Sequence, residues 1–145
     1  AGTRAFRAIA PIEYGALCDV GRQRQHQEDT AVVLSELGLG MVLDGMGGSS
    51  SGNVASEAAA CAIADAWADA LAVGALWGPS LDDNPLVTAI LLGNESILDL
   101  SQSNRMYTGI GSTVAAFAAA SRACASATPR SSRSCPRPTR TSRPT

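Results

Sequence analysis

Short apolar runs, separated by polar residues and glycines, fill the first third of the chain and predict β-strands. The clearest runs lie at residues 30–34 and 39–43, which are rich in aliphatic side chains. Gly38 stands in the short connection between them, so the two runs predict a hairpin. The alternating segment over residues 14–20 predicts one more strand, which ends at Gly21.

The apolar period becomes helical after residue 53. Small side chains recur about every fourth position up to residue 73, with Ile63, Trp67 and Leu71 beside them. The repeated members of this stripe are Val54, Ala58, Ala62, Ala66 and Ala70. This pattern predicts a helix whose small contact face packs closely on a sheet.

Two further elements follow in the second half of the chain. A helix is predicted from Pro85 to about residue 101, because Asn84 is a favourable cap and proline suits the first helical position. Residues 109–120 predict a strand, in which Thr113, Val114 and Phe117 are expected to be buried. The fold class is therefore α+β.

The composition changes sharply after residue 120. Residues 121–145 contain only Ser, Arg, Ala, Cys, Thr and Pro, so they offer no large apolar side chain. Such a segment cannot bury enough surface to offset the entropy of ordering, and we expect it to be disordered. The prediction is one domain over residues 1–120, followed by this tail.

Charge is distributed unevenly along the chain, although the formal net charge is only −2. All 13 acidic residues lie at or before Asp99, whereas six of the 11 basic residues lie between Arg122 and Arg143. The basic tail has no aromatic residue to stack on bases, so no nucleic-acid partner is expected. The sequence lacks a membrane-crossing apolar run and a recognisable secretory signal, which predicts a cytoplasmic protein without a membrane partner.

The cysteine and histidine content restricts the possible metal chemistry. The cysteines show no Cys-x-x-Cys spacing and are expected to be free thiols; they are Cys18, Cys61, Cys124 and Cys135. His26 is the only histidine, so a zinc site of the usual kind is not indicated. Any metal site must use oxygen ligands.

The most informative stretch is residues 44–56, Asp-Gly-Met-Gly-Gly-Ser-Ser-Ser-Gly-Asn-Val-Ala-Ser. It places a carboxylate at the end of an apolar run and then four glycines within nine residues, before the first predicted helix. Glycines allow the backbone to approach a ligand closely, so such a corner suits a metal or an anion. The alternative is an ordinary strand-to-helix connection in which the serines act as caps.

Three ordered motifs resemble one known family. Arg24 followed by Glu28-Asp29, and Asp-Gly-Met-Gly-Gly at residues 44–48, are similar to two signatures of the bacterial type 2C, metal-dependent protein serine/threonine phosphatases. Residues 109–117 resemble that family's next strand, Gly-x-Gly-Ser/Thr-Thr. The resemblance covers residues 14–120 and implies the N-terminal half of a four-layer α-β-β-α sandwich, here truncated.

The resemblance implies hydrolysis of phosphoserine or phosphothreonine in proteins by a water bound at two Mn²⁺ or Mg²⁺ ions. It assigns Asp44 as the ligand that bridges both metals, Glu28 as a ligand of the second metal and Gly45 as a carbonyl ligand. Asp29 matches an outer-shell carboxylate, and Arg24 the arginine that binds the substrate phosphate. Arg24 and Asp44 are thus the expected catalytic residues. An alternative for Arg24 is a surface ion pair with Glu28.

The chain also departs from the family pattern. Gln27 stands where bacterial members usually have Asn, and Ser49 where many have His. The family's Gly-Asp-Ser strand and two later aspartates are missing, because the last carboxylate is Asp99. Two alternatives therefore remain: a non-catalytic module that binds phosphopeptides or a divalent cation, or a defective truncated product. A separate expectation is that the tail from about Ser121 is translated out of frame. The resemblance also implies that the intact phosphatase acts on proteins phosphorylated by a serine/threonine kinase.

Overall fold

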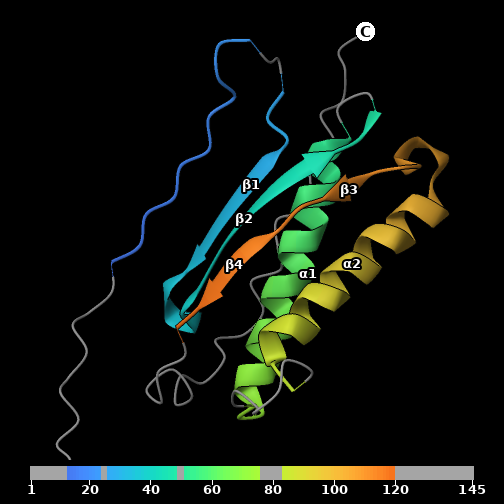
Figure 1. Cartoon of the computed structure of the whole chain (residues 1–145). Helices are drawn as coiled ribbons and strands as arrows, with labels where there is room; N and C mark the ends of the chain where they lie inside the picture. The colour runs from blue at the N-terminus through green and yellow to red at the C-terminus, as the bar shows by residue number, and fades with distance from the viewer. Residues whose placement is uncertain (1–12, 24–25, 49–50, 76–82, 120–145) are drawn as a thin grey trace, which may run out of the picture.

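The computed structural model describes residues 13–23, 26–48, 51–75 and 83–119. These residues form a mixed α+β structure in which two long helices lie on one side of a small antiparallel sheet (Figure 1). The α+β class predicted from the sequence is therefore confirmed. The predicted tail over residues 121–145 lies outside the described residues.

The predicted hairpin is present, and its second strand is the central strand of the sheet. Strand β1 (Asp29–Leu34) pairs antiparallel with β2 (Leu39–Met46), and a short 3-10 turn, η1 (Ser35–Leu37), connects them. Gly38 ends this turn at φ 60°, in the left-handed region that favours glycine. The register runs from Asp29 opposite Asp44 to Leu34 opposite Leu39.

The strand predicted over residues 109–120 is interrupted. It forms β3 (Gly111–Ser112) and β4 (Ala115–Ala118), and both pair antiparallel with β2 on the edge away from β1. The predicted burial of Thr113 and Phe117 was wrong, since Thr113 is exposed and Phe117 is 51% exposed. Phe117 lies opposite Gly40, on the sheet face without helices; the sequence period does not say which face the helices cover.

Helix α1 (Gly52–Ala72) packs on the sheet and supplies much of the core. Its most buried side chains include Ile63 and Trp67, whereas the predicted alanine stripe is only half-buried. Trp67 also ties the helix to the hairpin, because its Nε1 donates a 2.9 Å hydrogen bond to the Leu37 carbonyl. The facing residues of the sheet are Leu39, Met41 and Leu43.

Helix α2 (Pro85–Ser103) begins where the sequence predicts. The Asn84 side chain caps it by accepting a 2.9 Å hydrogen bond from the Leu86 backbone N–H. The helix packs closely on α1: a Cβ added at Gly93 would lie 2.8 Å from the Ile63 side chain. A 3-10 turn, η3 (Arg105–Tyr107), then leads to β3.

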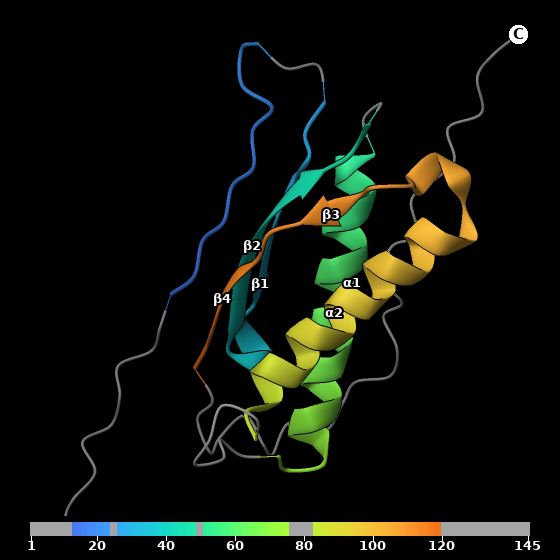
Figure 2. The same cartoon turned by 45° about the vertical axis from the view of Figure 1, so that its right-hand side comes forward.

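The other face of the sheet has no helix among the described residues, as the turned view shows (Figure 2). Residues 13–20 are extended on this side but do not form the predicted strand, because no described strand pairs with them. The Tyr14 ring stacks on Phe117, with centroids 5.8 Å apart. Exposed apolar side chains remain on this face at Val42 (55%) and Phe117 (51%).

The expectation that all cysteines are free was wrong. Cys61 is disulfide-bonded, while Cys18 is free and exposed. Pairing depends on how close two cysteines lie in the fold, which sequence spacing does not reveal. None of the helices in the described part of the chain combines the length and apolar character that crossing a bilayer requires.

Candidate functional site

Two of the predicted site carboxylates meet at the end of the hairpin. Asp29 begins β1 and lies directly opposite Asp44 near the end of β2. Asp29 is half-buried and Asp44 is exposed. Like charges directly opposite each other on an antiparallel pair are destabilising, so a bound cation would relieve this repulsion.

The two aspartates line a hollow of about 410 Å³ on the helix-free side of the sheet. The extended segment before β1 contributes Cys18 and Asp19, and Gln27 also borders the hollow. Asp19 accepts a 2.7 Å hydrogen bond from the Gly21 N–H. No described residue donates a hydrogen bond to the carboxylate of Asp29 or Asp44, so hydrogen bonds from those residues do not offset the negative charge of these two side chains.

The third motif lies beside the second and holds the Asp44 backbone. The Thr113 N–H donates a 2.9 Å hydrogen bond to the Asp44 carbonyl, and the Ser112 hydroxyl donates to the same oxygen at 3.2 Å. The Asp44 N–H in turn donates to Thr113 Oγ1 at 3.3 Å. Sequence reasoning assigned no such role to Ser112 or Thr113, although the Ser-Thr pair of the motif was visible in the sequence.

Two glycines allow the end of β2 to approach the start of α1. A Cβ added at Gly45 would lie 2.0 Å from the Gly52 carbonyl oxygen, so only glycine fits there without movement. A Cβ added at Gly52 would lie 2.7 Å from the Gly45 carbonyl oxygen and 3.0 Å from the Glu28 carboxyl carbon. Both predicted ligand groups, the Gly45 carbonyl and the Glu28 carboxyl, thus lie within 3.0 Å of the position that a Cβ on Gly52 would take.

The predicted ligands are gathered at one end of the hairpin but on two sides of it. Asp29 and Asp44 border the hollow, whereas Glu28 lies against Gly52 at the start of α1. Within the described ranges, no three His, Cys, Asp or Glu side chains come together closely enough to hold a metal. The carboxylate oxygens of Glu28, Asp29 and Asp44 suit a hard ion such as Mn²⁺ or Mg²⁺, but these three residues supply only part of a ligand set.

Two other sequence expectations bear on this corner. Arg24 lies outside the described residues, so its predicted contact with phosphate and the alternative ion pair with Glu28 both stay predictions. Ser51 precedes α1 but makes no side-chain cap hydrogen bond, which weakens the alternative in which the serines only cap the helix. Ser49 and Ser50 also lie outside the described part of the chain.

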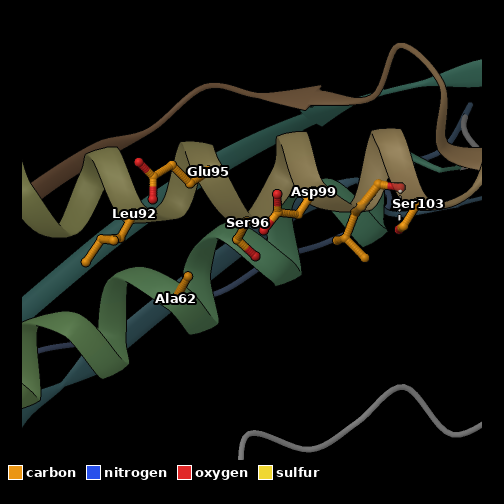
Figure 3. Close-up of a pocket in the computed structure, with 7 residues that line it drawn as sticks. Ala62, Leu92, Glu95, Ser96, Asp99 and Ser103 are labelled. Atoms are coloured by element: carbon orange, nitrogen blue, oxygen red, sulfur yellow. Dashed lines mark hydrogen bonds between the residues drawn. The ribbon is translucent and has the colours of Figure 1, made fainter.

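A second hollow, of about 520 Å³, lies along α1 and α2 (Figure 3). Glu95 and Asp99 line it from α2, and Ala62 lines it from α1. It includes no residue of the three motifs, and of its two serines Ser103 already donates a hydrogen bond to the Leu100 carbonyl. Nothing in its composition indicates a particular ligand.

Comparison with known proteins adds no support for the resemblance to the phosphatase family. No model of a known protein family matches the chain, and no curated protein matches it. Any function must therefore be argued from the motif residues themselves and from their arrangement.

Proposed function

We propose that this chain carries the N-terminal half of a metal-dependent protein serine/threonine phosphatase domain. One observation supports this most strongly: the described residues of the three motifs, which are separate in the sequence, meet at one end of the sheet. Asp29 is opposite Asp44, Gly45 is opposite Ser112, and the Glu28 carbonyl accepts a hydrogen bond from the Gly45 N–H. An ordinary strand-to-helix connection does not require this convergence.

In the proposed site, each motif residue has a distinct task. Asp44 would supply its carboxylate as a metal ligand, and Glu28 and the Gly45 carbonyl would supply further oxygen ligands. Asp29 accepts hydrogen bonds from water and so orients it, while Arg24 binds two phosphoryl oxygens of the substrate through its planar guanidinium. When bound, Mn²⁺ or Mg²⁺ lowers the pKa of a water and polarises the phosphoryl group.

The proposal extends to the finer fold and the biological setting. The helix-free sheet face, with Val42 and Phe117 more than half exposed, suits the second sheet of a four-layer α-β-β-α sandwich. The substrates would be cytoplasmic proteins phosphorylated by a serine/threonine kinase.

The test is hydrolysis of a phosphothreonine peptide by the full chain in the presence of Mn²⁺. We expect weak turnover that depends on Mn²⁺ and is abolished in Asp44→Asn, because the substitution removes charge from the ligand shared by both ions. The variant keeps the backbone hydrogen bonds of Asp44 to Thr113, so its fold should be preserved. Turnover that persists in Asp44→Asn would rule out the assignment of this residue.

A second candidate is a non-catalytic module that binds a divalent cation or a phosphopeptide. It is favoured by the incomplete ligand set of the described residues. This candidate predicts Mn²⁺ binding that Asp44→Asn removes, without any turnover by the unmodified chain. A defective product would show neither binding nor turnover.

A further inference from the structure

Ser56 is a fully buried polar residue on a helix face that is otherwise small and apolar. Its exposure is 0%, and its neighbours on this face include Ala55, Ala59 and Ala60. A buried hydroxyl is unfavourable unless it is hydrogen-bonded. The partners of Ser56 therefore indicate what its hydroxyl does.

The Ser56 hydroxyl connects α1 to the residues around the start of β1. It donates a 2.7 Å hydrogen bond to the Glu28 carbonyl, and its oxygen lies 2.9 Å from Thr30 Oγ1. The Asn53 carbonyl, one turn earlier in α1, is farther away at 3.2 Å. If Thr30 donates to Ser56 and Ser56 donates to Glu28, both hydroxyl hydrogens are used in one chain of hydrogen bonds.

The Glu28 carbonyl is the point where three elements meet. It also accepts a 3.1 Å hydrogen bond from the Gly45 N–H at the end of β2. This carbonyl belongs to the peptide unit that joins Glu28 to Asp29, so its orientation determines the direction in which both carboxylates leave the backbone. Ser56 and Gly45 hold that peptide unit from two sides.

We infer that Ser56 is a positioning residue, which sets the Glu28–Asp29 peptide and so the direction in which each carboxylate leaves the backbone at this end of the hairpin. This inference rests on the proposed function and adds a residue to it, since Ser56 lies in the helix and contacts neither Asp44 nor the hollow. Alanine at position 56 would still pack on the sheet. The specific contribution of the hydroxyl is thus the orientation of the acidic pair.

The test uses the full chain, labelled with ¹⁵N and ¹³C, and titrates it with Mn²⁺ alone. Bound Mn²⁺ broadens nearby amide signals, so those of Asp29, Asp44 and Gly45 report on the site even when binding is weak. Ser56→Ala should raise the Mn²⁺ concentration for half-broadening by about tenfold, the lower end of the effect of outer-shell changes. Without metal, the Glu28 carbonyl ¹³C resonance should shift, because it loses a hydrogen bond.

The matched control is Ala60→Gly, which weakens the same buried face of α1 one turn beyond Ser56 and has no hydroxyl to lose. Its Mn²⁺ midpoint should stay within about twofold of the unmodified chain. A second variant, Thr30→Val, removes the hydroxyl that lies next to Ser56 and keeps Ser56 itself. Its midpoint should lie between those of the unmodified chain and Ser56→Ala.

The outcomes separate this inference from the proposed function. Absence of selective broadening in the unmodified chain would overturn the cation site, and the positioning role with it. Selective broadening with equal midpoints for Ser56→Ala and the unmodified chain would overturn the positioning role alone. If Ser56→Ala does not fold, an unchanged midpoint in Thr30→Val would overturn it instead.

Discussion

Position 45 requires glycine because backbone atoms of neighbouring segments lie too close for a side chain, and not because of an unusual backbone angle. It has no positive φ, yet a Cβ there would lie 2.0 Å from the Gly52 carbonyl oxygen and 2.7 Å from the Glu28 carbonyl oxygen. Both neighbours are backbone atoms, which cannot move aside as a flexible side chain can. Close approach therefore couples the second motif to the residue before β1.

Gly45→Ala should destabilise the fold by about 1–3 kcal/mol, because the added methyl group forces the start of α1 away from β2. Gly48→Ala is a matched control in the same motif, since a Cβ at Gly48 meets nothing within 4 Å. Urea unfolding followed by circular dichroism measures both variants. Equal stability of the two would show that β2 and α1 are farther apart than the structure has them.

Arg24→Ala should weaken phosphate binding and leave Mn²⁺ binding nearly unchanged, because the proposed contact of this guanidinium is with the substrate. Loss of charge-assisted hydrogen bonds should raise the dissociation constant for a phosphopeptide by about tenfold or more. Isothermal titration with the phosphopeptide, and separately with Mn²⁺, makes the comparison. An equal loss of Mn²⁺ affinity would favour the alternative role, an ion pair with Glu28.

The charged residues of the candidate site could be predicted from the sequence, whereas the residues that orient its backbone could not. Glu28, Asp29 and Asp44 stand out in their motifs, and the structure places them at one end of the hairpin. Ser56 and Thr113 were not recognised, because their hydrogen bonds join positions 28 and 69 residues apart in the chain. A lone serine or threonine has no local pattern that reveals such a partner.

At the scale of elements, the start of α2 shows how local chemistry determines a boundary. Asn84→Ala should destabilise the fold by about 1 kcal/mol, because it removes the acceptor for the Leu86 N–H. Asn94→Ala is the control: it lies exposed within the same helix, where alanine is the better helix former. Thermal unfolding should show a lower Tm for the first variant and an unchanged or higher Tm for the second.

Elements that depend on local signals were predicted well, and those that need a distant partner were not. The start of α2 follows from its cap, the Gly38 turn from its glycine and α1 from its periodicity, and these signals act within a few residues. Residues 14–20 have strand-like alternation, but a strand requires a neighbour with which to exchange hydrogen bonds. The described residues offer none on that side of the sheet.

For the whole molecule, the helix-free sheet face is the dominant surface feature. Val42 and Phe117 lie together on it, at 55% and 51% exposure, and Tyr14 covers only part of Phe117. Exposed apolar side chains on one sheet face promote association. The second sheet of the proposed sandwich would bury both side chains.

The chain should therefore self-associate as its concentration rises, and Phe117→Ser should reduce that association. Leu91→Ser is the matched control, because Leu91 is 59% exposed but lies on α2, away from the sheet face. Sedimentation velocity at several concentrations compares the variants. A monomeric chain with a sharp cooperative melt would contradict the prediction, as would equal effects of the two substitutions.

The largest-scale prediction concerns the gene. Residues 121–145 lack acidic and large apolar side chains, and they follow directly after the segment whose next family element would be a Val-Gly-Asp-Ser strand. An Arg-, Ala-, Pro- and Ser-rich composition without lysine is what GC-rich DNA yields when it is translated in a wrong frame. We therefore predict that the tail is a frameshift product and that the intact gene encodes a complete phosphatase domain.

The genetic code makes this prediction testable at defined codons. The third base of each codon is combined with the first two bases of the next, beginning at Ala125. Ala125 with Ser126 then permits GTC, Ser126 with Ala127 permits GGC, Ala127 with Thr128 permits GAC, and Thr128 with Pro129 permits TCC. These codons specify Val-Gly-Asp-Ser, so the missing strand can be encoded at this place in the shifted frame. Sequencing the gene checks the third bases, and we expect an open frame that continues beyond them with two further aspartates in metal-ligand positions. Different third bases, or a stop soon after them, would contradict the frameshift and mean that the tail is genuine.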